Sequence, residues 1–188
     1  MICITLSGIK KHGPCSDEFK RLLNRIGMSE EEDNQHISME TIIDSNGIDE
    51  AIWCLCAVSG HDKEIRLFAV WCARQVQHLM TDKRSVDAID VAEQHALGAA
   101  TEDDLRAAFE EAWNSALHNV HRSACVSESS AAWAAVWAAA KRDEAGGSVW
   151  AAARAAVRAA ERLEARDVAL AAQEAEFRRV FCGEEDRA

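Results

Sequence analysis

The chain has 188 residues and a formal net charge of -11, and 48% of its residues are hydrophobic. A chain of this length can bury a core without metal or disulfide staples, and its acidity argues against nonspecific binding to DNA or to an anionic membrane surface. It has one proline and no tyrosine, and alanine dominates its second half. Because alanine loses least on forming a helix and proline breaks one, the composition predicts an all-α fold.

The cysteines and the N-terminal residues indicate the cellular compartment of the protein. The seven cysteines are an odd set without the spacing of a disulfide framework, which is typical of reduced core residues. The first residues lack the charged region and long apolar stretch of a signal peptide, and the alanine-rich run 131–140 is too short to span a bilayer. We therefore expect a cytoplasmic protein that has no membrane-spanning segment.

Capping and breaking residues divide the first half into short elements. Ser16 and Ser38 are good N-caps, and Gly27 and Gly47 are good helix ends. The acidic stretch 29–35 reads as a loop. The expected elements are a short strand or extended arm at 1–6 and helices at 17–26, 39–46, 50–58 and 63–80.

The helix expected at 63–80 has two patterned faces. A broad apolar face runs through Ile65 and Phe68, and a second stripe consists of Leu67, Trp71, Arg74 and His78. A helix that is apolar on two faces is sandwiched between neighbours. The second stripe has two interpretations: an aromatic and arginine surface typical of binding hot spots, or a tryptophan packed on a neighbouring helix with its arginine paired to a carboxylate.

The second half reads as longer helices. Thr101 and Asp104 have the spacing of a capping box, and the helix that they open should run to about residue 124 with Leu105 and Trp113 on its apolar face. A helix is expected before it at 85–96. After a polar break at 127–130, two alanine-rich helices are expected at 131–144 and 148–181, hinged at 146–147 and bent near 164–167.

These elements predict an all-α bundle of about seven or eight helices. Residues 1–126 would form an N-terminal helical domain, and residues 127–188 an alanine-rich helical hairpin that packs on it or extends from it.

Two further sets of residues in the second half are candidates for partner binding. Trp133 and Trp137 lie one turn apart in alanine-rich sequence, which suits either the core or a surface for forming a homodimer. Arg154, Arg158 and Arg162 recur every fourth residue and continue to Arg166. That basic stripe is either a solvated face paired with nearby glutamates or a surface for an acidic partner. The acidity of the whole chain makes a nucleic-acid partner unlikely.

One polar stripe could hold zinc. Glu111, Asn114, His118, His121 and Cys125 fall on one side of a helix, and imidazole and thiolate groups are good zinc ligands. A solvated polar face explains the same spacing, and no fourth protein ligand can be identified. We therefore expect no resident metal and no cofactor.

The sequence carries no recognisable catalytic motif. It lacks a glycine-rich phosphate loop, a serine nucleophile elbow and a histidine-glutamate metalloprotease motif. Cys15, with His12 nearby, sits ahead of a helix N-terminus, where a thiol can have a lowered pKa. A capped, partly buried thiol accounts equally for that arrangement, and we do not expect an enzyme.

Two strings carry a resemblance to a known family. They are NGIDEAIWCL at 46–55 and RLFAVWCAR at 66–74. In these strings the chain resembles immunity proteins of bacteria and phages, and the likeness extends over about residues 6–113. The resemblance implies a helical protein that binds and neutralises a toxin, and it implies no catalytic residues.

The leading hypothesis is therefore a stoichiometric protein-binding inhibitor of the immunity type, which occludes a bacterial toxin or effector. A phage-encoded anti-defence inhibitor, for example an anti-CRISPR protein that binds a host defence complex, is the alternative. A homo-oligomeric structural protein and a zinc-binding protein are further alternatives.

Overall fold

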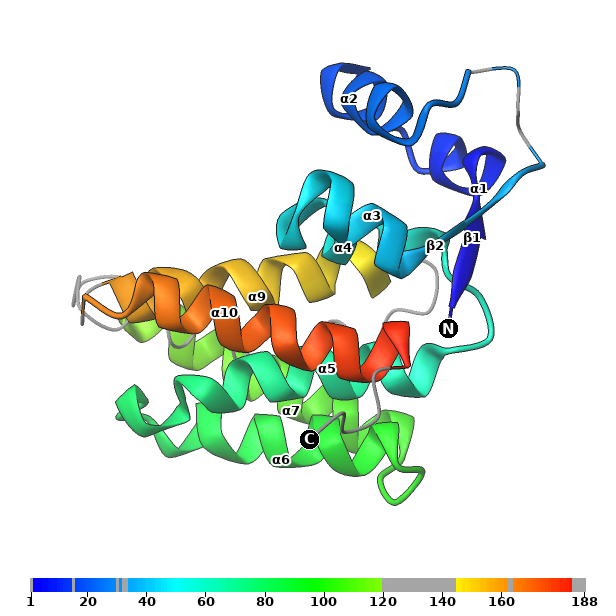
Figure 1. Ribbon diagram of the computed structural model, residues 1–188. Helices are drawn as coiled ribbons and strands as arrows, with labels where there is room; N and C mark the ends of the chain where they lie inside the picture. Colours follow the sequence, from blue (N-terminus) through cyan, green and yellow to red (C-terminus); the bar gives the residue numbers. More distant parts are fainter. Residues whose placement is uncertain are drawn as a thin grey trace.

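The fold is a bundle of helices with one small sheet (Figure 1). The structure is a computed structural model that describes residues 2–14, 16–29, 31, 34–119, 145–161 and 164–183. The predicted all-α class is confirmed, and no helix in these ranges is long and apolar enough to cross a membrane. The α-helices are α1 (Leu6–Lys11), α2 (Ser16–Ile26), α3 (Met39–Asn46), α4 (Ile48–Cys54), α5 (Asp62–Gln75), α6 (Lys83–Ala96), α7 (Glu102–Asn119), α9 (Ala145–Glu161) and α10 (Arg166–Phe177).

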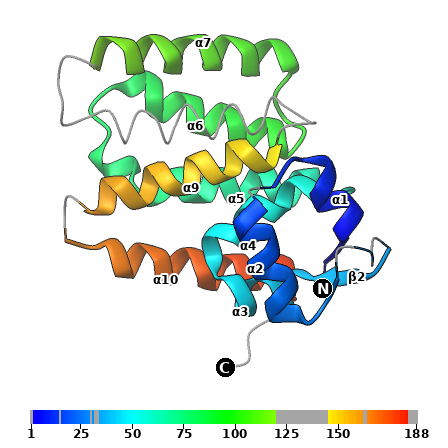
Figure 2. The same cartoon turned by 90° about the horizontal axis from the view of Figure 1, so that it is seen from above.

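Helix α9 lies at the centre of the bundle. It packs against α4, α5 and α10, while α6 continues the layer from α5 and α7 lies outermost against α6 (Figure 2). Its buried residues face several directions, and among them Ala152, Ala156 and Ala159 are at most 2% exposed. A helix that is apolar on several faces is sandwiched between its neighbours, and alanine lets neighbouring helix axes approach closely. The alanine-rich composition therefore serves the core, which α9 shares with helices of the first half.

Helix α5 is sandwiched as its two apolar faces predict. It packs against α9 and α6, and Phe68 on its buried face is 1% exposed. The Phe68 ring contacts Phe177 and Phe181 edge-on at centroid distances of 5.9 and 5.6 Å. Phe177 ends α10, and Phe181 lies in the π-helix η3 (Arg178–Cys182) that continues it. These three rings join the C-terminal helix to the middle of the bundle.

The N-terminal arm forms a strand, as expected. Strand β1 (Cys3–Thr5) pairs antiparallel with β2 (His36–Ser38), with Ile4 opposite Ile37. Both isoleucines are buried. The N–H of Ile2 donates to the carbonyl oxygen of Phe181 over 3.1 Å, so the small sheet is tied to the C-terminal helix. Strand β2 was not predicted, because three residues after an acidic loop carry too little pattern to indicate a strand.

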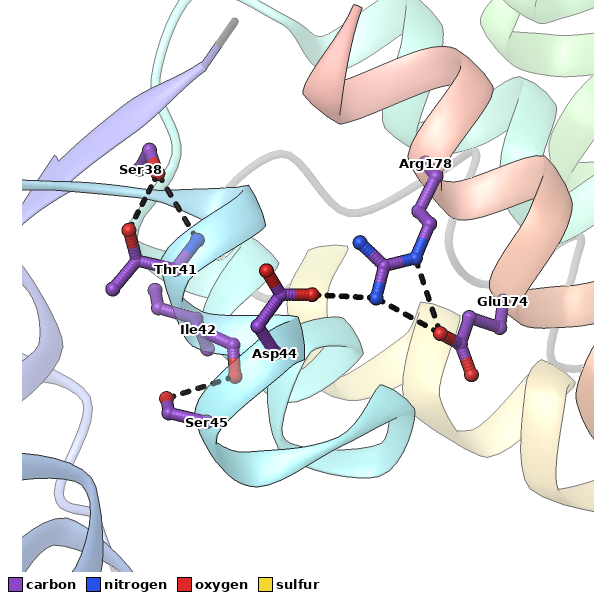
Figure 3. A network of polar contacts seen from close by, with 7 residues as sticks. All are labelled: Ser38, Thr41, Ile42, Asp44, Ser45, Glu174 and Arg178. Atoms are coloured by element: carbon purple, nitrogen blue, oxygen red, sulfur yellow. Dashed lines mark hydrogen bonds and ion pairs between the residues drawn. The ribbon is translucent and has the colours of Figure 1, made fainter. Parts of the chain in front are cut away.

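Helix α3 begins and ends where its capping residues predict. The N–H of Thr41 donates to Ser38 Oγ over 3.0 Å (Figure 3). Gly47 follows the helix with φ at 91°, in the region that favours glycine, and its N–H donates to the carbonyl oxygen of Ile43. The same figure shows Arg178 of η3 bound to Asp44 of α3 over 2.6 Å, which fastens α3 to the C-terminal helix.

Replacing Ser38 with alanine should lower the free energy of unfolding by about 1 kcal/mol, because the first turn of α3 loses its side-chain acceptor. Urea unfolding followed by circular dichroism measures the change. Ser59→Ala is the matched control, since Ser59 is exposed and caps no helix in the described part of the chain. Equal stabilities of the two variants would contradict the capping role.

The capping box at the start of α7 is confirmed. The N–H of Thr101 donates to Asp104 Oδ2 over 2.9 Å, and the N–H of Asp104 donates to Thr101 Oγ1 over 3.2 Å. The Thr101 hydroxyl also donates to the same carboxylate. These hydrogen bonds hold the pKa of Asp104 below its usual value. A carboxyl with a lowered folded-state pKa stabilises the fold above its unfolded pKa, and that contribution is lost as pH falls through the folded pKa.

Asp104→Asn should therefore destabilise the protein most at neutral pH, and the difference from wild type should vanish at low pH, where the aspartate is itself protonated. Urea unfolding of both proteins between about pH 7 and pH 2, a range that extends well below the ordinary aspartate pKa, measures this difference. A difference that stays constant across the range would show that the charge of Asp104 contributes nothing.

The second alanine-rich helix begins earlier than predicted, since Gly146 and Gly147 lie in the first turn of α9. The hinge predicted before it borders residues outside the described part of the chain and stays a prediction. The chain reverses at the bend expected near residue 164, so α9 and α10 lie antiparallel (Figure 2). Glu164 has φ at 55°, and the N–H of Ala165 donates to the carbonyl oxygen of Ala160. This is the bond of a helix C-cap that usually contains glycine. The helix expected at 131–144 lies outside the described residues.

Three helices differ from their predictions in where they end or in which face is buried. The helix expected at 50–58 ends at Cys54 and continues as the 3-10 turn η1 (Leu55–Ala57). The helix expected at 63–80 ends at Gln75 and is followed by η2 (Gln77–Leu79). Trp113 does not lie on the buried face of α7, because it is 45% exposed while Leu105 and Ala112 are fully buried. The short helix α1 was missed, because six residues carry little periodicity.

Candidate functional site: a groove between α5 and the C-terminal helix

A groove lies between α5 and the C-terminal helix, over the cluster of phenylalanines. Its volume is about 450 Å³. Trp71 and Leu67 of α5 and Val180 of η3 are partly buried and give it an apolar surface, with Phe68 beneath. Charged residues surround this surface. The complete lining consists of Glu64, Leu67, Phe68, Val70, Trp71, Arg74, Glu93, Glu176, Arg179 and Val180.

Trp71 is held in place by stacking. Its ring lies on the Phe68 ring with a centroid distance of 6.1 Å and an interplanar angle of 10°. Phe68 is in turn fixed by the two C-terminal phenylalanines. A partly exposed tryptophan on a rigid aromatic support loses little conformational freedom when a partner covers it.

Arg74 is bound to the neighbouring helix α6. Its guanidinium donates to Asp90 Oδ1 over 2.9 Å and also to the Glu93 carboxylate, and a third bond reaches Gln77 Oε1 over 2.9 Å. Partial burial acts to lower the pKa of Arg74, but the hydrogen bonds to Glu93 and Asp90 outweigh it and raise that pKa. The predicted pairing of this arginine with a carboxylate is thus present, on a side chain that also lines the groove.

The arginine on the C-terminal side of the groove is also paired. Arg179 Nη2 lies 2.6 Å from Glu176 Oε1 on the C-terminal helix. Small-molecule sites hold a few polar groups that converge on the ligand, whereas the arginines here already bind carboxylates of this chain. The groove thus has an apolar and aromatic centre with a satisfied polar rim, which is the anatomy of a protein interface.

His78 does not belong to this groove. It is exposed and lines a second groove of about 260 Å³, between the end of α5 and the hairpin of α9 and α10. Alanines dominate the hairpin side of that second groove, and Val168 near it is 72% exposed. The predicted stripe of Trp71, Arg74 and His78 is therefore divided, because α5 ends at Gln75 and the chain turns before the histidine.

The predicted arginine stripe is also divided. Arg154 binds Asp49 of α4, with Nη1 and Oδ2 3.0 Å apart, and so contacts the bundle. Arg158 is exposed on α9, and Arg162 lies outside the described residues. Arg166 follows the reversal of the chain and begins α10. The prediction that one basic stripe continues through all four arginines is therefore wrong.

Several other candidates lie where the structure gives no side-chain placement. These are Trp133, Trp137, His121, Cys125, Cys15 and the side chain of His118. Glu111 of the proposed zinc stripe lies 3.9 Å from Arg84, measured between Oε2 and Nη1. In the described part of the chain, no three histidine, cysteine or carboxylate side chains form a group that could hold a metal ion.

The buried thiols are not activated. Burial raises the pKa of Cys54 and of Cys72 far above the ordinary value. Burial also raises the pKa of Cys56 to about 11. Since the thiolate is the nucleophile, these three cysteines remain protonated and unreactive at neutral pH. Cys54 and Cys72 are core residues, as their apolar surroundings predict, and Cys56 is partly buried.

The sequence did not reveal the C-terminal side of the groove. Glu176, Arg179 and Val180 line it together with α5. Nothing in their own segment indicates that they meet residues about a hundred positions earlier. The phenylalanines at 177 and 181 were the available signal, because an aromatic pair one turn apart indicates a buried contact.

Comparison of the chain with models of protein families, with curated proteins and with solved structures finds no match.

Proposed function

We propose that the protein is a stoichiometric protein-binding inhibitor of the immunity type, which acts by covering a functional surface of a bacterial toxin or effector. The observation that carries the proposal is the groove over Trp71. Binding hot spots are enriched in tryptophan and arginine, and they lie in apolar centres ringed by polar residues. Trp71 and Arg74 stand in such an arrangement.

The mode of action needs no catalytic group of the inhibitor. A partner side chain that enters the groove would meet the stacked Trp71 ring, while charges of both signs at the rim would select a complementary surface. Standard protein interfaces bury about 800 Å² on each partner. The groove would therefore be the centre of a larger contact that includes neighbouring faces of α6 and α10.

Affinity capture tests the proposal. The tagged protein is incubated with a lysate of the bacterium that carries its gene, and the bound proteins are identified and quantified. One protein recovered in a fixed molar ratio, and lost when Arg179→Glu reverses a rim charge, is the expected result. Arg106→Glu is the matched control, since Arg106 is exposed on α7 outside the groove and, like Arg179, pairs with a carboxylate three residues earlier. Capture that is unaffected by Arg179→Glu would contradict a role for the groove.

The identity of the captured protein separates the two versions of the proposal. A toxin supports the immunity version, and a subunit of a host defence complex supports a phage anti-defence version. Recovery of the protein only as copies of itself would instead support a homo-oligomeric structural protein.

A further inference from the structure

A separate cavity lies beside α4, away from the groove over Trp71 and from the alanine-lined groove at the end of α5. It lies between the segment of α1 and α2 and the pair α3 and α4, with Arg154 of α9 beside them, and it is open on one side. Its volume is about 160 Å³, smaller than the roughly 300–1,000 Å³ of ordinary small-molecule pockets. A cavity of this size suits one long side chain or a similarly small molecule. The lining consists of Ile9, Pro14, Phe19, Leu22, Ile42, Asn46, Asp49, Glu50, Trp53, Cys54 and Arg154.

The charged groups of the cavity leave one carboxylate without a partner. Asp49 is bound by Arg154, with Oδ2 and Nη1 3.0 Å apart. Glu50 is partly buried, and among the described residues its carboxylate forms no hydrogen bond or ion pair. The two carboxylates and one guanidinium therefore leave the cavity with a net negative charge. A partly buried carboxylate favours a cation beside it.

Asn46 supplies a second acceptor. It lies at the end of α3 and lines the cavity, and its Oδ1 atom is buried without a hydrogen-bond donor. Buried side-chain oxygens are nearly always hydrogen-bonded, so an exception calls for an explanation. The atom has less than 1 Å² of accessible surface, so a donor in the cavity would reach it after the Asn46 amide rotates towards the cavity. A cationic N–H group would therefore supply both the counter-charge for Glu50 and the hydrogen-bond donor for Asn46.

The rest of the lining suits the body of such a ligand. Phe19, Leu22 and Ile42 are buried and apolar, so they can contact a methylene chain. Trp53 is partly buried and also lines the cavity. Indole is the best aromatic partner for a cation. The ammonium is compact and carries three donors, which suits separate acceptors in a small space better than a planar guanidinium does.

We propose that this cavity binds a primary alkylammonium group, with Glu50 as the counter-ion, Asn46 as a hydrogen-bond acceptor and Trp53 as the aromatic wall. The group is either a lysine side chain of a bound protein or a free aliphatic amine. The cavity and the groove share no lining residue. The inference therefore does not rest on the proposed function, and either can fail alone.

Nuclear magnetic resonance titration of the full chain tests the proposal. The probes are Nα-acetyl-lysine methylamide and its uncharged analogue Nα-acetyl-norleucine methylamide, and the reporters are the Trp53 indole N–H and the Asn46 side-chain amide. The lysine probe should shift both signals saturably, and the norleucine probe should not. Equal shifts with both probes, or no saturable shift with the lysine probe, would overturn the proposal.

Variants test the role of the carboxylate. Glu50→Gln should weaken binding of the lysine probe about tenfold, because a charge-assisted hydrogen bond is lost. Glu110→Gln, an exposed position on α7 outside the cavity, should leave the affinity unchanged. An affinity of Glu50→Gln equal to that of wild type would overturn the assignment. Putrescine separates the two sources: tighter binding of putrescine than of the lysine probe indicates a free amine, and the reverse order indicates a protein side chain.

Discussion

Phe177→Ala should lower the free energy of unfolding by about 3–5 kcal/mol, which is the usual range for removing a fully buried phenylalanine. Phe177 is 0% exposed, and its ring lies 4.8 Å from the Phe181 ring and 5.9 Å from the Phe68 ring, measured between centroids. The substitution would leave a cavity where the C-terminal helix meets α5. Such a loss is a large share of the total stability of a typical domain, about 5–15 kcal/mol.

Chemical denaturation of the wild type and the variant measures this change. Val168→Ala is the matched control, because Val168 is on the same helix α10 but 72% exposed. Exposed substitutions usually change stability by about 0.5 kcal/mol or less. A loss below about 1 kcal/mol for Phe177→Ala, under the low end expected for buried aromatic truncation, would show that the aromatic cluster is not a central part of the core.

Trp71→Ala should weaken binding of the captured partner by about 30-fold or more, which corresponds to about 2 kcal/mol, the threshold of a hot-spot residue. The physical reason is the loss of an aromatic surface that the Phe68 stack holds in place. Isothermal titration calorimetry with the purified partner gives the affinity. The free energy of unfolding is measured in parallel, so that a loss of binding is not confused with a loss of fold.

Trp113→Ala is the control for Trp71→Ala. Trp113 is 45% exposed on α7, which lies on the far side of α6 from α5 (Figure 2). Its replacement should leave the partner's affinity within about twofold, as expected for residues outside the binding centre. An equal loss of affinity in the two variants would place the interface elsewhere.

The sequence predicted the features that depend on residues close together in the chain. Ser38 and the pair of Thr101 and Asp104 were recognised as caps, because a side-chain acceptor within three residues satisfies the N–H groups of a first helical turn. The sandwiched position of α5 followed from its two apolar faces. In the two caps the partners lie within three residues of one another, and for α5 the signal lies in the periodicity of a single helix.

Features that depend on distant partners were missed or misplaced. The reversal after α9 was predicted only as a bend near residues 164–167, because Glu164 occupies the left-handed position where glycine is the usual signal. Gln173 of α10 is buried because its side-chain amide donates to the carbonyl oxygen of Ala153 on the antiparallel helix, over 2.9 Å. Strand β2 exists because residues 3–5 pair with it. The partners of Gln173 and of strand β2 are far from them in sequence.

The candidate sites, too, were predicted only where their residues lie on one helix. Trp71 and Arg74 were selected from one helix face, and both line the groove. The opposite wall comes from the C-terminal helix and needed the tertiary structure. The cavity beside α4 was not predicted, because its lining comes from α1, α2, α3, α4 and α9 and no single helix face carries it.

Inhibition stoichiometry tests the central claim most directly. The activity of the captured partner is titrated with the purified protein, in parallel with its Trp71→Ala variant. A stoichiometric inhibitor that binds through the groove should abolish the activity at one equivalent, and the variant should require a large excess. Full activity of the partner at a tenfold excess of the wild-type protein would contradict the account.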